Sequence, residues 1–257
     1  NEGIMQSSIP TVNKIAEVTA LFWMIKIVAT TLGETFGDFF SQTLDLGYVI
    51  GLGITGAMLL TALFFQIRST RYHPALFWAA IAGTTTFGTE ISDLLDRTLH
   101  VGYIGGSLIL AAGLALTLIV WYRREGSLEV DPITQGRAEI LFWVAVVFSN
   151  ALGTAFGDFL VDVAGLGYGG AALVCTAVIA LVLVLHYTRA MNEIALFWIA
   201  FIFTRPFGAT FGDLLTKPIA KGGLDLGTLN ASIVSLVLIS GLIGLSWRNM
   251  PERSVAR

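Results

Sequence analysis

Residues 21–38 read LFWMIKIVATTLGETFGD, and the pattern of this stretch recurs three more times along the 257-residue chain. Each copy begins with Leu-Phe-Trp and has an Asp fifteen residues after the Trp. The four pairs are Trp23/Asp38, Trp78/Asp93, Trp143/Asp158 and Trp198/Asp213. A spacing that is kept four times indicates an internal repeat, and this repeat organises the rest of the chain.

A second apolar segment with almost no charge follows each Trp–Asp stretch. These segments cover residues 49–66, 104–120, 169–185 and 229–245. Each is close to the ~20 residues that a membrane-spanning helix needs. A large soluble core would instead require helices with polar faces, which these runs lack. We therefore expect an all-α polytopic membrane protein with eight transmembrane helices, built from four two-helix repeats.

The composition agrees with a membrane protein and argues against several other classes. Residues are 55% hydrophobic and 13% charged, whereas soluble domains have about 25% charged residues. The net charge of -3 without a basic stripe argues against a nucleic-acid partner. The single Cys175 argues against disulfides and cysteine metal sites. No nucleophile elbow, phosphate loop or zinc motif is present, so we do not expect an enzyme.

A longer period divides the chain into two halves. Trp23 and Trp143 are 120 residues apart, as are Trp78 and Trp198. This predicts a first half at residues 1–122, a polar cytoplasmic linker at 123–136 and a second half at 137–257. Because each repeat has two helices, all repeats insert in the same direction and can be related by a rotation about the membrane normal.

The distribution of Lys and Arg predicts the orientation. Segments between repeats and at the termini hold ten of these residues, and the loops inside repeats hold Arg97, Lys217 and Lys221. Positive charge accumulates on the cytoplasmic side, so we expect both termini in the cytoplasm. The first ten residues are polar and lack a basic segment, so we expect no signal peptide.

Each Trp–Asp stretch also has one polar stripe. Positions 7, 11 and 15 after the Trp are four residues apart and therefore share one helix face. The stripes are Thr30, Glu34 and Asp38; Thr85, Thr89 and Asp93 with Glu90 adjacent; Asn150, Thr154 and Asp158; and Arg205, Ala209 and Asp213. Ionisable side chains are costly inside a membrane and mark ion or proton pathways.

The donor types of the stripes favour a hard cation. Carboxylate, hydroxyl and amide oxygens suit Mn²⁺, Mg²⁺ or Ca²⁺, and buried carboxylates also bind protons. We therefore predict a transporter of a small divalent cation that exchanges protons. The predicted metal ligands are Glu34, Asp38, Asp93, Asp158 and Asp213, and the wider ion-binding set adds Thr30, Glu90, Asn150 and Arg205. Arg205 is a candidate counter-ion for a carboxylate of another repeat, and Lys26 for Glu34.

Several alternatives stay open at the level of sequence. The small-xxx-small pairs Gly33/Gly37, Gly88/Ser92, Gly153/Gly157 and Gly208/Gly212 are typical of close helix packing. In that interpretation the Asp residues only cap helix ends. A proton-driven carrier of an organic substrate would have an enclosed mid-membrane cavity with aromatic walls. A non-transporting scaffold would have its carboxylates fully paired with Arg205, Lys26 and loop amides. The lipid bilayer is the expected partner, and assembly into a homo-oligomer is a further alternative.

The segments 17–23 (EVTALFW), 30–35 (TTLGET) and 45–48 (DLGY) resemble a family of bacterial integral membrane proteins. That family is described as uncharacterised membrane-anchored proteins with repeated G-E-x-x-G-D-like motifs. The likeness covers nearly the whole chain and is most specific in the first repeat. It implies a location in the bacterial inner membrane and brings no activity. The prediction of cation transport therefore rests on the polar stripes.

Overall fold

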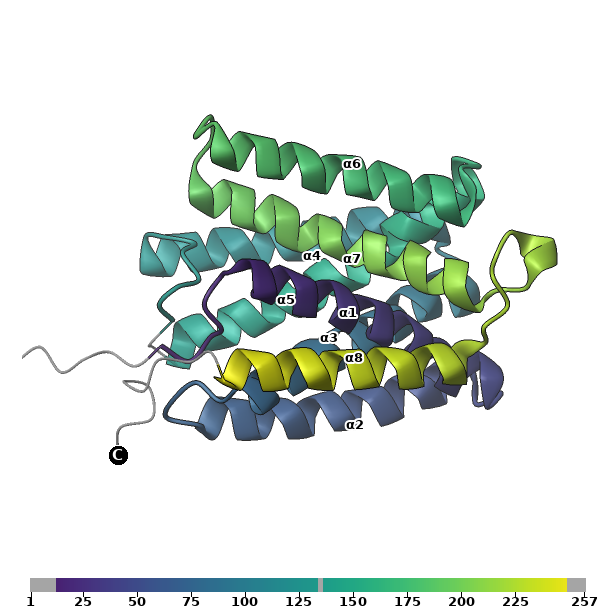
Figure 1. Cartoon of the computed structure of the whole chain (residues 1–257), viewed down its shortest axis with the longest axis horizontal. Helices are drawn as coiled ribbons and strands as arrows, with labels where there is room; N and C mark the ends of the chain where they lie inside the picture. Colours follow the sequence, from purple (N-terminus) through teal and green to yellow (C-terminus); the bar gives the residue numbers. More distant parts are fainter. Residues whose placement is uncertain (1–12, 134–135, 249–257) are drawn as a thin grey trace, which may run out of the picture.

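The computed structural model describes residues 13–133 and 136–248, in which all regular structure is helical (Figure 1). The eight α-helices of this part are α1 (Ala20–Asp38), α2 (Gly47–Arg68), α3 (Pro74–Asp93), α4 (Gly102–Glu125), α5 (Gly136–Asp158), α6 (Gly167–Tyr187), α7 (Glu193–Thr216) and α8 (Thr228–Arg248). They confirm four two-helix repeats. The polar first ten residues, Arg253 and Arg257 lie outside the described residues.

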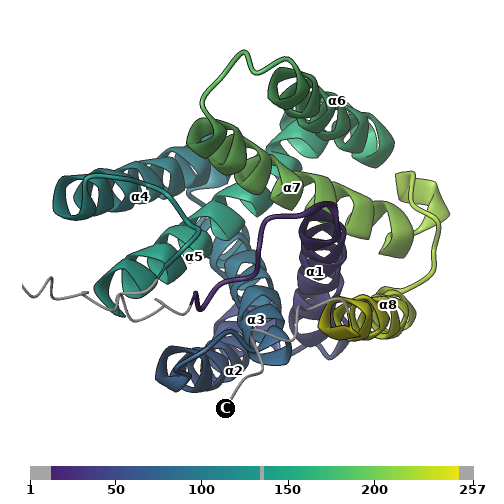
Figure 2. The same cartoon turned by 60° about the vertical axis from the view of Figure 1, so that its left-hand side comes forward.

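The first helices of the four repeats form a closed inner ring. α1 contacts α3, α3 contacts α5, α5 contacts α7, and α7 contacts α1. The second helices lie outside this ring, α2 on α3, α4 on α5, α6 on α7 and α8 on α1 (Figure 2). Each repeat therefore covers the inner helix of the next repeat, and the fourth repeat covers the first.

Close contact in the ring depends on the Gly ten residues after each Trp. A Cβ atom on any of these four glycines would overlap the neighbouring inner helix. The pairs in contact are Gly33 with Thr85, Gly88 with Asn150, Gly153 with Arg205, and Gly208 with Thr30. The packing interpretation of the glycines is thus confirmed. Each partner is the first stripe residue of the following repeat, so the stripes face the inside of the ring.

Six helices are long and apolar enough to cross a membrane within the described residues. They are α2, α4, α5 with its continuation to Val163, α6, α7 and α8. α1 and α3 do not belong to this group, because Lys26, Glu34 and Glu90 make these two inner helices less apolar. The structure therefore supports a multi-pass membrane protein, while eight crossings stay a prediction.

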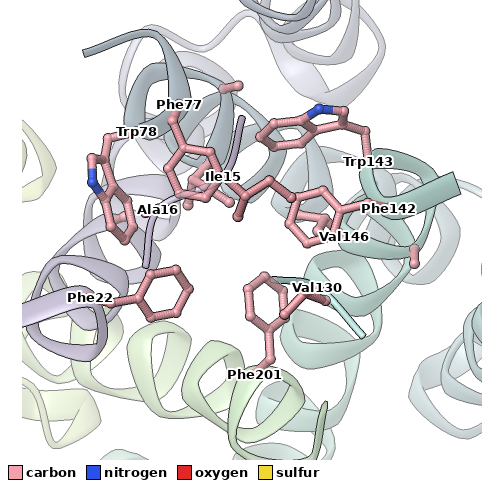
Figure 3. Packing of buried hydrophobic residues seen from close by; sticks show 14 of the residues in the cluster. Ile15, Ala16, Phe22, Phe77, Trp78, Val130, Phe142, Trp143, Val146 and Phe201 are labelled. Atoms are coloured by element: carbon pink, nitrogen blue, oxygen red, sulfur yellow. The ribbon is translucent and has the colours of Figure 1, made fainter. Parts of the chain in front are cut away.

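Aromatic side chains fill the end of the ring where the inner helices begin. Figure 3 shows Phe22, Phe77, Phe142 and Phe201, one from each inner helix, around Ile15 of the segment before α1. Successive Phe-Trp pairs make edge contacts, such as Phe77 and Trp78 with ring centroids 5.1 Å apart. The repeated Phe-Trp pairs therefore serve packing and close this end of the ring.

The opposite end of the ring contains the aspartates. After Asp38, Asp93 and Asp158 the chain continues as π-helical turns, namely Phe39–Thr43, Leu94–Thr98 and Phe159–Val163. These three carboxylates therefore do not cap helix ends, and π-helical turns often occur at functional sites. In the fourth repeat α7 ends at Thr216 and a short 3₁₀ turn, Ile219–Lys221, follows.

Candidate functional site: a ring of carboxylates and cations

Arg205 of α7 crosses the centre of the ring and is fully buried. Its Nη2 donates to Glu34 Oε2 at 2.8 Å, to Thr89 Oγ1 at 2.5 Å and to Thr154 Oγ1 at 2.6 Å. Nη1 also donates to the carbonyl oxygen of Thr30 at 3.3 Å. One guanidinium thus joins α1, α3, α5 and α7. The prediction that Arg205 pairs with a carboxylate of another repeat is confirmed.

Lys217, directly after α7, bridges the fourth repeat and the first. Its Nζ lies 2.5 Å from Asp38 Oδ2 and 3.2 Å from Asp213 Oδ1. It also donates to Gln42 Oε1 at 3.3 Å. Asp38 and Asp213 are almost fully buried. The ammonium group therefore lies between two buried carboxylates of adjacent repeats.

Arg97 makes the equivalent bridge between the second repeat and the third. Its Nε donates to Asp93 Oδ1 at 3.1 Å, and Nη2 lies 3.7 Å from Asp158 Oδ2. Arg97 precedes Lys217 by 120 residues, the period that relates the two halves. Neither Arg97 nor Lys217 was among the predicted site residues. Each stands four residues after its own Asp, on the same helix face, and this spacing was the available signal.

Three of the five predicted metal ligands come together in one group. Ligand oxygens of Glu34, Asp38 and Asp213 all lie within 4.8 Å of one another, and the three residues are buried. Asp93 and Asp158 form the separate pair that Arg97 bridges. The ring thus has a three-carboxylate cluster around Lys217 and Arg205, and a two-carboxylate pair around Arg97.

The remaining predicted site residues differ in their surroundings. Thr30 Oγ1 donates to the Thr204 carbonyl at 3.2 Å, across the contact of α1 with α7. Asn150 donates to Thr84 Oγ1 at 3.0 Å. Glu90 is fully buried and lies against Gly51 of α2, and within the described part of the chain neither of its carboxylate oxygens has a hydrogen-bond partner. Glu90 is therefore placed at the α2–α3 contact.

The prediction that Lys26 pairs with Glu34 is wrong. Lys26 is fully buried, and its Nζ has no hydrogen-bond partner among the described residues. It lies 4.0 Å from the centre of the Phe201 ring, a cation–π arrangement. Glu34 forms its ion pair with Arg205 instead. Lys26 is two helical turns away from that carboxylate on α1, whereas Arg205 reaches it from the neighbouring helix α7.

The charges of the site do not balance. The five carboxylates face three basic side chains, Arg97, Arg205 and Lys217. Including Lys26 and Glu90 leaves the net formal charge of the ring unchanged, because the charges of these two residues cancel. Two formal negative charges are therefore left in a buried region. Such charge is tolerated only when it is paired or neutralised, so two additional positive charges would bring the formal charge of the ring to zero.

One comparison with known proteins identifies the repeat. A family model described as "Repeat of Unknown Function (DUF347)" matches residues 21–72, 76–127, 141–191 and 196–250. Each match covers most of one inner helix and the outer helix that follows it. No curated protein and no solved structure matches the chain. The repeat model brings no activity, and the G-E-x-x-G-D-like motif and the membrane-anchored family stay a resemblance.

Proposed function

This chain belongs to the DUF347 repeat family, and we propose that its four repeats form a carrier that exchanges a divalent cation for protons. In this proposal all eight helices cross the bacterial inner membrane, with both termini in the cytoplasm. Mn²⁺ and Mg²⁺ are the favoured substrates, with Ca²⁺ as a third. The protein acts as a transporter and carries out no chemical conversion.

The charge count of the ring carries this proposal. Five buried carboxylates face three fixed cations, which leaves two negative charges. Either one divalent cation or two protons would neutralise the ring. Because unneutralised charge is strongly disfavoured in a low-dielectric interior, the two forms would exclude each other. This mutual exclusion is the physical basis for exchange.

The donor set supports a hard divalent cation as the substrate. Glu34, Asp38 and Asp213 offer oxygens within 4.8 Å of one another, and carboxylate oxygens are the preferred ligands of these ions. The Lys217 ammonium now lies between two of the three carboxylates. An arriving cation would displace it, so that binding would move the end of α7.

Two alternatives receive less support. A proton-driven carrier of an organic substrate calls for an enclosed mid-membrane cavity with aromatic walls beside the proton-binding acids, whereas the cavity between α1, α6 and α7 is lined by none of the five carboxylates. A purely structural scaffold would have its carboxylates fully paired with fixed cations, Lys26 included, whereas Lys26 forms no ion pair with any carboxylate of the described residues. The five carboxylates of the ring share only three basic partners.

Calorimetry with Mn²⁺ on the protein in lipid nanodiscs tests the proposal. We expect wild type to bind Mn²⁺, and Asp38→Asn and Asp158→Asn to lose at least roughly tenfold in affinity, about 1.4 kcal/mol. The matched control is Asp45→Asn, an exposed carboxylate in the loop before α2. Titrations in buffers of different ionisation enthalpy should report about two protons released per ion, as the charge count requires.

The proposal fails if wild type binds none of Mn²⁺, Mg²⁺ and Ca²⁺ at millimolar concentration. It also fails if both ring variants bind Mn²⁺ as tightly as wild type does. In liposomes, a pH gradient should drive Mn²⁺ accumulation in wild type and in Asp45→Asn, and the two ring variants should show none.

A further inference from the structure

A cavity of about 750 Å³ lies beside the ring, between α1, α6, α7 and linker residues 128–131. This volume is within the range of small-molecule sites. Its walls are mainly apolar and include Ile27, Ile179 and Phe197. None of the five ring carboxylates lines it, so the cavity is a feature separate from the cation site.

Trp23 gives this cavity an aromatic wall. The equivalent Trp78, Trp143 and Trp198 of the other repeats are only 1%, 2% and 6% exposed, whereas Trp23 is half-buried and lines the cavity. Its ring centroid lies 5.7 Å from that of Phe197 on α7. The α1–α7 contact is thus the place where a ligand can reach a repeat tryptophan.

One end of the cavity is negatively charged. Glu129, Asp131 and Glu193 line it, and no Lys or Arg among the described residues forms an ion pair with them. Glu193 contacts His186 at 2.8 Å. Burial raises the pKa of Asp131, and the nearby charges of Glu17 and Glu129 raise it further. A positively charged group would relieve this repulsion.

The two ends of the cavity differ in character. Glu193 begins α7, and Thr204, eleven residues later, lines the inner end. At 1.5 Å per residue the cavity therefore extends roughly 16 Å along α7. A molecule with a positively charged head and an apolar chain of about this length matches both its shape and its charge.

We propose that this cavity binds an amphiphilic cation, with its ammonium head at Glu129, Asp131 and Glu193 and its chain along Trp23 and Phe197. The chain gains little by leaving lipid for an equally apolar wall. Preference for this ligand over membrane lipid therefore depends on the acidic end. The site does not depend on the proposed cation transport.

Equilibrium binding of radiolabelled dodecyltrimethylammonium to the full chain in nanodiscs tests this site, with empty nanodiscs subtracted. We expect saturable binding that dodecyl sulfate and dodecylphosphocholine do not displace. Ala180→Trp, which fills the cavity from α6, should weaken binding at least tenfold. Leu181→Trp is the matched control, because Leu181 is 56% exposed on the same helix and does not line the cavity.

Removing the acidic end should have the same effect. We expect the triple variant Glu129→Gln, Asp131→Asn and Glu193→Gln to lose at least tenfold in affinity for the probe. Three outcomes would overturn the proposal. They are no saturable binding to wild type, unchanged binding in Ala180→Trp, and equal displacement by dodecylphosphocholine, which would identify a lipid site without charge preference.

Discussion

Arg205 connects the four inner helices because of the shape of its side chain. A guanidinium has five N–H donors in a rigid plane, so it can serve acceptors in several directions at once. Here Nη2 lies within hydrogen-bonding distance of Glu34, Thr89 and Thr154 on three helices, and Nη1 donates to the Thr30 carbonyl oxygen. A lysine could not reproduce this planar arrangement. The centre of the ring thus depends on one residue that replaces a Thr or Asn at the same position of the other repeats.

Replacing Arg205 by Met should strongly destabilise the protein. The change leaves Glu34 buried without its counter-ion, which costs roughly 3–5 kcal/mol. Melting temperatures in detergent would measure the effect. The double variant with Glu34→Gln should recover part of the loss, because it removes the unpaired charge. An Arg205→Met protein that is as stable as wild type would contradict the role of this ion pair.

Asp131 gives stability a pH dependence of known sign. Burial, with Glu17 and Glu129 nearby, raises its pKa in the folded protein, so the folded state holds the proton more tightly than the unfolded state. The contribution of Asp131 to the free energy of unfolding is therefore highest at low pH, where Asp131 is protonated, and it falls as pH rises through the folded pKa. Asp131→Asn should keep an acceptor for the Asn13 side chain, whose Nδ2 lies 2.6 Å from Oδ1.

We expect Asp131→Asn to stabilise the protein at pH 8 and to have little effect at pH 4. The gain should stay below about 1 kcal/mol, because solvent screens this partly exposed group. Melting curves of both proteins at the two pH values would show it. A stabilisation that grows toward low pH would have the wrong sign and would exclude this explanation.

At the scale of helices, each outer helix packs on the inner helix of the next repeat. The inner helices approach one another closely because glycine faces the first stripe residue of the neighbour. This contact turns the polar stripes inward and the apolar outer helices toward lipid. Glycines and stripe residues alternate along one face of each inner helix. The same face therefore provides both the close helix contacts and the polar side chains inside the ring.

Gly208→Ala should destabilise the ring, and Gly241→Ala should not. A Cβ at Gly208 would overlap Thr30 of α1, whereas a Cβ at Gly241 of α8 meets nothing within 4 Å. Overpacking a close contact costs typically about 1–3 kcal/mol, while Ala in an open helical position favours the helix by up to about 1 kcal/mol. Thermal stability of the two variants in detergent provides the comparison. Equal effects would mean that the α1–α7 contact tolerates a larger separation.

At the scale of the whole molecule, the ion bridges hold the two halves together. Arg97 of the first half reaches Asp158 of the second, and Lys217 of the second reaches Asp38 of the first. Arg205 and Glu34 also come from different halves. The same side chains that create the charged ring therefore connect the two halves. The predicted division at residues 123–136 stays a prediction.

Halves separated between Gly126 and Ser127 should assemble when they are co-expressed. The interface keeps the three ion bridges of the ring, the ion pair of Lys14 with Glu139, and the contacts of α1 with α7 and α8 and of α5 with α3 and α4. An affinity tag on one half should therefore retain the other in equal amount. Arg97→Glu with Lys217→Glu makes two bridges repulsive and should abolish co-purification. Lys221→Glu, an exposed charge of the same loop as Lys217, is the control. Halves that stay separate in all cases would show that the covalent linker is required.

The sequence by itself determined the features that depend on local spacing. The Trp–Asp period identified four two-helix units, and a separation of four residues placed Glu34 and Asp38 on one face because an α-helix has 3.6 residues per turn. The glycines indicated close packing for the same reason. Helical geometry acts over a few residues, so the printed sequence contains all that these predictions need.

Only the tertiary structure decided which charges meet. The ring closes because α8 covers α1 and α7 contacts α1, and this closure brings Lys217 to Asp38, 179 residues earlier in the chain. The closed ring also pairs Glu34 with Arg205 and leaves Lys26 in contact with the Phe201 ring. Side-chain reach between helices depends on their order and distance in space, which local spacing does not specify.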